Sequence, residues 1–152
     1  METLTKLDNQ YDNQHFENTS HAPLIHLSAF ASFIIPFGSI LGQLITWMIW
    51  KDSNELDNQN GKQAVNFNLS IALYNIAILI IGVIIFVTPL LATLEMNSEN
   101  PVTLLFSLPG IWLLLGGFSL LGIIRIILII VAAIKSGNGE VYEYPFTIQF
   151  IK

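Results

Sequence analysis

The chain has 152 residues, of which 53% are hydrophobic and only 11% are charged, and its net charge is −5. This composition leaves too little polar surface to cover the long apolar blocks in a soluble domain. The acidic balance argues against nucleic acid as a partner, and the absence of cysteine excludes disulfides, thiolate metal sites and cysteine nucleophiles. We therefore expect an integral membrane protein.

The first 21 residues are polar and acidic. A segment of this composition cannot bury enough apolar surface to order itself, so we predict a flexible tail at 1–21. The apolar run that follows is too long for the core of a signal peptide, and we expect no cleaved signal.

Three apolar blocks follow the tail. Each is longer than the roughly 20 residues that a helix needs to cross about 30 Å of hydrocarbon. We therefore predict an all-α integral membrane domain over 22–152, with three transmembrane helices at about residues 23–50, 64–94 and 111–134.

The third block begins before its predicted span, at Pro101. If it ran to Ile134 as one helix it would be about 50 Å long, which is too much for one straight crossing. Pro109 and Gly110 are the natural break. We predict a short interfacial or re-entrant segment at 102–108.

Lysine positions predict the orientation in the membrane. The first loop carries Lys51 and Lys62, the C-terminal end carries Lys135 and Lys152, and the N-terminal tail carries Lys6. The connection between the second and third spans has none. By the positive-inside rule, three crossings in a bacterial inner membrane place the first loop and the C-terminus in the cytoplasm and the N-terminus outside.

Small and polar residues form stripes on the predicted first helix. Gly38 and Gly42 make a small-xxx-small pair that lets another helix approach closely. An adjoining stripe should face protein, either for helix packing or as a polar pathway. It consists of Ser28, Ser32, Pro36, Ser39, Gln43 and Thr46.

Arg125 lies deep in the predicted third span. A guanidinium group there normally finds a partner or water, and Gln43, Tyr74 and Asn75 are placed at similar depth. These four residues form a candidate buried polar layer. Arg125 either pairs within this layer or with helix carbonyls, extends to the cytoplasmic interface, or serves a substrate or proton.

Three histidines raise the question of a metal site. The spacings of His15, His21 and His26 do not place all three on one helical face, so we expect no metal and no cofactor. We expect His26 at the outer interface, bonded to a backbone group or a lipid headgroup.

The first loop contains three acidic residues, Asp52, Glu55 and Asp57. Their spacing does not match a calcium-binding loop. We expect all three carboxylates in a solvated loop.

The C-terminal tail at 136–152 alternates in polarity. Its aromatic and apolar side chains recur with a period of two, which predicts an extended segment with one apolar face. Pro145 disfavours a central strand, so the tail should lie at the cytoplasmic interface or against the first loop. A protein-docking edge is the alternative. The alternating residues are Tyr142, Tyr144, Phe146, Ile148 and Phe150.

Four stretches carry a resemblance: His26-Leu27-Ser28, Ile35-Pro36-Phe37-Gly38, Gly61-Lys62-Gln63-Ala64-Val65-Asn66-Phe67-Asn68 and Gly139-Glu140-Val141-Tyr142-Glu143-Tyr144-Pro145. Together they resemble a small bacterial membrane family of unknown function that is distantly related to the Tic-twenty component of chloroplast protein import. The likeness covers about residues 22–152. Its motif residues are His26, Ser28, Pro36, Lys62, Asn66, Phe67, Gly139, Glu140, Tyr144 and Pro145.

The resemblance implies a compact helical membrane domain. Relatives include magnetosome membrane proteins that affect mineral growth. This chain has no mineral-binding acidic cluster, which argues against such a role here. The resemblance supplies no mechanism.

The leading hypothesis is a non-enzymatic membrane component in the lipid bilayer. It would associate with copies of itself or with other membrane proteins through the Gly38/Gly42 face and the surface made by the first loop and the tail. The alternative is an oligomeric transporter or channel for ions or small solutes, lined by the buried polar layer. We do not expect an enzyme, because no Ser-His-Asp arrangement, acid pair, HExxH or phosphate loop is evident.

Overall fold

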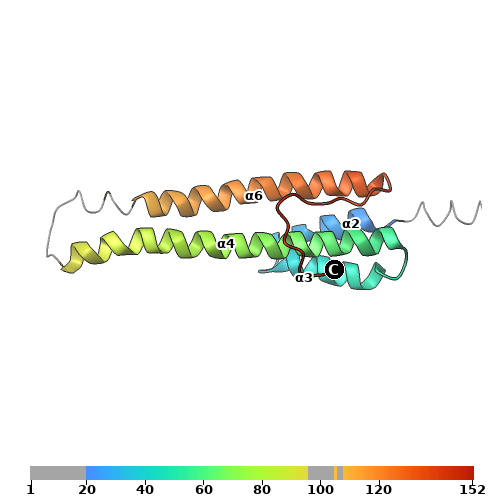
Figure 1. The fold of residues 1–152 in the computed structure, drawn as a ribbon, viewed down its shortest axis with the longest axis horizontal. Helices are drawn as coiled ribbons and strands as arrows, with labels where there is room; N and C mark the ends of the chain where they lie inside the picture. Colours follow the sequence, from blue (N-terminus) through green and yellow to red (C-terminus); the bar gives the residue numbers. More distant parts are fainter. Residues whose placement is uncertain (1–19, 96–104, 106–107) are drawn as a thin grey trace, which may run out of the picture. The chain divides into compact units, whose positions relative to one another are not determined.

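The computed structural model describes residues 20–95, 105 and 108–152, with side chains omitted at 93–95. Every regular element in this part of the chain is helical (Figure 1). The chain divides into two compact units, one from Met1–Leu69 with Leu128–Lys152 and one from Ser70–Ile127. In order, the elements are α2 (Ala22–Leu27), η1 (Ser28–Phe33), α3 (Gly38–Trp50), α4 (Glu55–Glu95) and α6 (Leu108–Gly137).

The segment predicted as the first span is a helical hairpin and not one continuous helix. Helix α2 runs into the 3-10 helix η1, the chain turns at 34–37, and α3 returns beside η1 (Figure 1). At the turn Pro36 lacks a backbone N–H, and Phe37 takes a left-handed conformation with φ 61°. These two residues interrupt the helical hydrogen bonding that the apolar composition favoured.

Close contacts hold the two arms of the hairpin together. A Cβ at Gly38 would collide with the Ala31 carbonyl group, so glycine is required there. The Ser28 and Thr46 hydroxyl groups lie 3.0 Å apart across the arms. Helix α3, with 13 residues, is about 20 Å long, which is shorter than the roughly 30 Å hydrocarbon core.

Helix α4 begins well before the apolar sequence that predicted it at 64. Asn54 caps its N-terminus, because the Asn54 Oδ1 atom accepts a hydrogen bond from the Asp57 backbone N–H at 2.7 Å. The polar first turns therefore join the helix, and the Asn60 amide within them is buried. The hydropathy boundary marks where the helix becomes apolar, and the capping residue marks where it starts.

The second unit is an antiparallel pair made by the later part of α4 and the first part of α6. A Cβ at Gly110 would lie 2.6 Å from the Phe86 backbone nitrogen, and Gly117 faces Ile78. Contact positions fall along α4 as they rise along α6, so the helices run in opposite directions. This close approach requires glycine at position 110.

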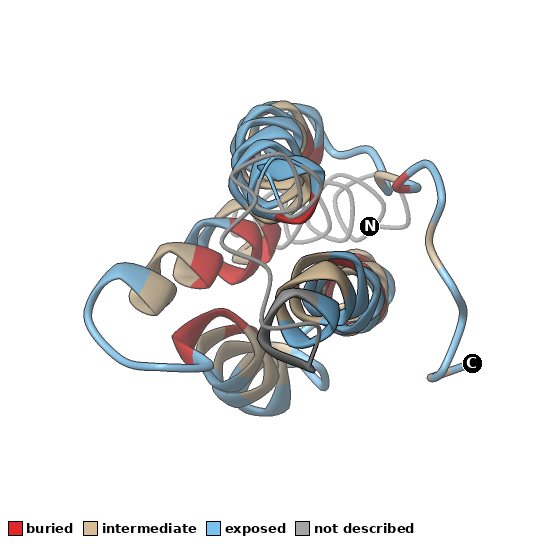
Figure 2. Cartoon of the chain, turned by 90° about the vertical axis from the view of Figure 1, so that its left-hand side faces the viewer, coloured by how far each residue is buried: buried red, intermediate tan, exposed pale blue. Residues whose placement is uncertain are grey.

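Within the described part of the chain, two helices are long and apolar enough to cross a membrane, over Glu55–Ala92 and Leu108–Gly137. Only 11% and 17% of their most apolar windows are buried within the chain, and Figure 2 shows both helices largely exposed. This exposure is what a lipid-facing surface requires. Of the segment predicted at 102–108, only Leu105 and Leu108 are described, and Leu108 already begins α6.

The C-terminal tail leaves α6 through Gly139, whose φ of 82° suits glycine. It is extended without forming a strand, and it turns at Pro145 and Phe146, where φ is 59°. The predicted single apolar face is therefore not formed, because Tyr144 is 5% exposed and Phe146 is 87% exposed. A left-handed residue reverses the alternation that an uninterrupted extended chain would keep.

Candidate functional site

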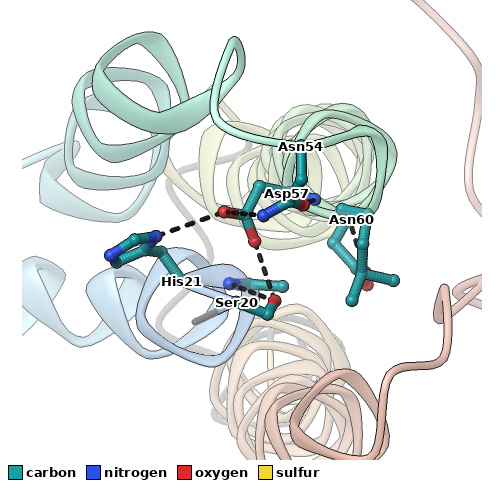
Figure 3. Close-up of polar contacts among 7 residues, drawn as sticks. Ser20, His21, Asn54, Asp57 and Asn60 are labelled. Atoms are coloured by element: carbon teal, nitrogen blue, oxygen red, sulfur yellow. Dashed lines mark hydrogen bonds and ion pairs between the residues drawn. The ribbon is translucent and has the colours of Figure 1, made fainter. Parts of the chain in front are cut away.

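Polar side chains gather in the first unit, and one group surrounds the buried carboxylate of Asp57. Ser20 Oγ donates to Asp57 Oδ1 at 2.8 Å, and His21 Nδ1 lies 3.3 Å from Oδ2 (Figure 3). Asn54 Nδ2 also donates to Oδ2, at 3.0 Å. We call Ser20, His21, Asn54 and Asp57 the Asp57 cluster. It ties the start of α2 to the start of α4, and it contradicts the expected solvated position of Asp57.

A second group is centred on the buried ring of His26. Its Nε2 atom lies 3.0 Å from Asn60 Oδ1, and its Nδ1 atom lies 2.9 Å from the Tyr144 hydroxyl group. An amide oxygen only accepts, so Nε2 carries the proton and Nδ1 accepts from the Tyr144 O–H. We call His26, Asn60 and Tyr144 the His26 network. The expected partner of the His26 ring, a backbone group or a lipid headgroup, is wrong, since the side chains of Asn60 and Tyr144 hold both ring nitrogens.

Asn60 links three separate segments of the chain through its side chain. Its Nδ2 atom donates to the Leu56 carbonyl within α4 and to the Glu140 carbonyl of the tail, at 3.0 and 3.2 Å. Its Oδ1 atom accepts from the Tyr142 backbone N–H at 3.1 Å as well as from His26. Both donors and the acceptor oxygen are therefore satisfied, which is what a buried amide requires.

Burial sets the charge of the His26 ring. Desolvation lowers the pKa of His26 to about 4, and the hydrogen bond with Asn60 opposes this shift. The ring belongs to α2, outside the two helices that are long enough to span a membrane. It is therefore neutral at physiological pH, in agreement with its hydrogen-bond pattern.

The tail is fastened to α4 at two further points. The Tyr144 ring stacks on Phe67 with a centroid distance of 4.0 Å and an interplanar angle of 8°. Asn66 Oδ1 accepts from the backbone N–H groups of Phe150 and Ile151, and Asn66 Nδ2 donates to the Ile151 carbonyl at 2.8 Å. The tail thus contacts α4 at Asn66 and Phe67. These residues follow the first loop in the sequence, against which the tail was predicted to lie.

Gln43 extends the buried amides towards the hairpin. Its Nε2 atom donates to the His26 carbonyl at 3.3 Å, and its Oε1 atom accepts from Asn68 Nδ2 at 2.6 Å. Helix α3, α2 and α4 are joined by these two bonds. Gln43 therefore fixes the returning arm of the hairpin.

The predicted buried polar layer is distributed over both units. Gln43 belongs to the first unit, whereas Tyr74, Asn75 and Arg125 belong to the second. The last three side chains are half-buried on α4 and α6. Their common role stays a prediction.

The predicted packing face of Gly38 and Gly42 is occupied within the chain. A Cβ at Gly42 would lie 2.5 Å from the Ser28 carbonyl oxygen and 3.2 Å from Ala31 Cβ. The partner helix is the other arm of the same hairpin. The two glycines therefore serve packing within the hairpin, and association between copies of the chain stays a prediction.

Several of the motif residues behind the family resemblance meet in the first unit. His26, Asn66, Phe67 and Tyr144 contribute to the buried network, Gly139 turns the chain into the tail, and Glu140 contributes its carbonyl group. Ser28 joins the hairpin arms, Pro36 lies at the hairpin turn, Lys62 is half-buried and Pro145 is exposed at the tail turn. These motifs therefore describe how the tail and hairpin attach to α4.

Sequence reasoning missed Asp57 and Asn60 as structural residues. Together with Phe67 they lie at spacings of three and seven along α4, which is one helical stripe. That periodicity was the available signal. Within 20–95, 105 and 108–152, no group of three or more His, Asp or Glu side chains is placed to share a metal ion.

The chain matches a known protein family over most of its length. A family model described as the magnetosome magnetite crystal formation protein family matches residues 17–151. No curated protein and no solved structure matches the chain. The match outweighs the missing acidic cluster, which had argued against a place among magnetosome proteins. The chain belongs to the magnetosome magnetite crystal formation protein family.

Proposed function

We propose that the chain is a non-enzymatic membrane component of the apparatus that forms magnetite crystals. The family match over residues 17–151 carries this proposal, and the two long apolar helices support a place in the membrane. The buried polar side chains of the first unit are used to fasten the hairpin and the tail to α4. These bonds hold the hairpin and the tail in one arrangement. A fixed arrangement is expected of an assembly component that offers partners a defined surface.

Two crossings, by α4 and α6, replace the three that the sequence suggested. The start of α2 and the end of α3 lie together, because the His21 and Trp50 rings stack 4.7 Å apart. The start of α4 and the chain after α6 meet there through Asn60 and Glu140. All four helix ends therefore belong on one side of the membrane.

The positive-inside rule makes that side cytoplasmic. Lys51, Lys135 and Lys152 lie at or beyond these helix ends, Lys62 lies in the polar first turns of α4, and Lys6 precedes α2 in the sequence. With two crossings, the N-terminus joins the first loop and the C-terminus in the cytoplasm. The proposal thus reverses the predicted side of the N-terminus and keeps the other two.

The test is crystal growth on a membrane that contains the protein. Magnetite is co-precipitated from ferrous and ferric iron in the presence of liposomes with and without the full chain, and crystal sizes are measured by electron microscopy. We expect a shifted and narrower size distribution with the protein. Identical distributions would contradict the proposal, and liposomes carrying an unrelated two-span protein are the control.

An oligomeric transporter is the second candidate, and one buried atom favours it. Asn75 Oδ1 is buried in the second unit with no hydrogen-bond partner among the described residues. Such an atom in an apolar helix pair is suited to a passing solute or to a second copy of the chain. Flux of iron, protons and small anions into reconstituted vesicles distinguishes the candidates, because the assembly role predicts none. We also retain as a proposal the distant relationship to the Tic-twenty component.

A further inference from the structure

The hairpin of α2, η1 and α3 presents an apolar surface that none of the described residues of the first unit covers. No Asp, Glu, Lys or Arg occurs from Ala22 to Trp50. At the tip, Phe33, Ile34 and Phe37 are 74%, 86% and 75% exposed. A chain that placed these side chains in water would expose one continuous apolar patch.

The exposed face continues down the returning arm. Leu41, Ile45, Met48 and Ile49 are between 48% and 63% exposed along α3. The polar residues of the same arm point the other way, since Gln43 bonds to α2 and α4 and Thr46 bonds to Ser28. The hairpin is therefore apolar outside and polar inside, as expected of a structure surrounded by hydrocarbon.

Three backbone N–H groups at the turn are paired within the hairpin, which suits a lipid environment. The N–H groups of Ile34 and Ile35 both donate to the Ala31 carbonyl at 3.0 Å, and Gly38 N–H donates to the Ile35 carbonyl at 2.9 Å. Pro36 has no N–H to satisfy. Irregular backbone at membrane depth is tolerated only when such groups are paired.

Length and end positions exclude a crossing by this segment. Helix α3 is about 20 Å long, and both ends of the hairpin meet where His21 stacks on Trp50. We propose that Ala22–Trp50 is a re-entrant hairpin whose tip is embedded in the acyl chains of a single leaflet. This goes beyond the proposed function, which needs only the two crossings by α4 and α6.

The natural absence of cysteine makes sidedness directly measurable. Thr5→Cys, Asp52→Cys and Glu99→Cys are made one at a time in the full chain and labelled with a membrane-impermeant maleimide in intact spheroplasts. We expect Thr5→Cys and Asp52→Cys to be protected until the membrane is permeabilised, and Glu99→Cys to label at once. Opposite labelling of Thr5→Cys and Asp52→Cys would mean a full crossing and would overturn the proposal.

A second measurement tests the lipid contact itself. Ile35→Cys at the tip and Ser53→Cys in the loop are labelled with an environment-sensitive fluorophore in phosphatidylcholine–phosphatidylglycerol vesicles. We expect doxyl-labelled lipids to quench the tip fluorophore and aqueous iodide to quench the loop fluorophore.

Two results at the tip would overturn the lipid assignment. Quenching by iodide would place the tip in water, and efficient disulfide crosslinking between two Ile35→Cys chains would make a second copy the occupant. Phe33→Cys repeats the measurement at a neighbouring exposed position if Ile35→Cys fails to fold. None of these outcomes depends on magnetite formation.

Discussion

The Tyr144 hydroxyl group lies 2.9 Å from His26 Nδ1, although 118 positions separate the two residues in the sequence. Asn60, on a third segment, holds the other ring nitrogen. The His26 ring therefore makes both of its hydrogen bonds only when the hairpin, α4 and the tail are assembled.

Removing the Tyr144 hydroxyl group should loosen the tail. In Tyr144→Phe the ring can still stack on Phe67, but His26 Nδ1 is left buried without its donor. We expect a loss of about 1–3 kcal/mol in the free energy of unfolding, measured by denaturant titration in detergent. Tyr142→Phe is the matched control, since Tyr142 bonds Asn60 through its backbone N–H. Equal stability of the two variants would count against the His26 network.

Asn66 should control access to the end of the tail. Asn66→Ala removes three hydrogen bonds to the backbone of Phe150 and Ile151, so the last residues should detach locally. We expect faster carboxypeptidase digestion and faster amide hydrogen exchange there. Gln59→Ala, which loses only an exposed bond to Glu55, should digest at the unchanged rate.

Acid should weaken the first unit through His26. The folded pKa of about 4 lies below the unfolded value of 6.5, so the unfolded chain binds the additional proton. The contribution of His26 to the free energy of unfolding is fully present above pH 6.5 and is lost as the pH falls from 6.5 to 4. Below pH 4 this group causes no further change. The loss approaches about 3 kcal/mol, at about 1.4 kcal/mol per pH unit.

The variant His26→Asn isolates that contribution. Unfolding is followed across the same pH range for both proteins, and we expect the variant to be less stable at pH 7 and to have a shallower slope. Parallel slopes would show that His26 is not the group responsible.

The hairpin should depend on Gly38. A Cβ there collides with the Ala31 backbone, which cannot move as a flexible side chain would, so Gly38→Ala should lower the melting temperature. Gly116 meets nothing within 4 Å, and Gly116→Ala should raise helix stability by up to about 1 kcal/mol. Opposite signs for the two substitutions are the expected result.

The antiparallel pair of the second unit should depend on Gly110 in the same way. A Cβ at this position meets the backbone of Phe86 and Gly82 from the neighbouring helix. Gly110→Ala should destabilise the pair, and Gly122→Ala, with open space around it, should not. Thermal unfolding followed by circular dichroism in detergent compares them.

The sequence predicted the long helices well, because uninterrupted apolar runs favour helices in lipid whatever their neighbours are. The prediction of a continuous first span was wrong at Pro36 and Phe37. The apolar composition there favoured a helix, but the backbone turns. Pro36 belongs to the predicted polar stripe, but its missing N–H, two positions before Gly38, is the better signal of a turn.

The candidate site was less accessible to local reasoning. His26, Asn60 and Tyr144 come from three distant segments, and no periodicity connects them. Asn66 was singled out by resemblance, yet its partners are backbone atoms of the tail, which leave no mark in the sequence. Contacts of this kind appear only when the chain is folded.

Asn60 and Asn66 both hydrogen-bond to peptide groups of the tail. Many amino acids can therefore replace an outward-facing residue such as Gln149 without loosening this attachment. The outward-facing side chains of the tail are therefore free to vary. Related chains can present different side chains to a partner while the tail stays attached to α4 in the same way.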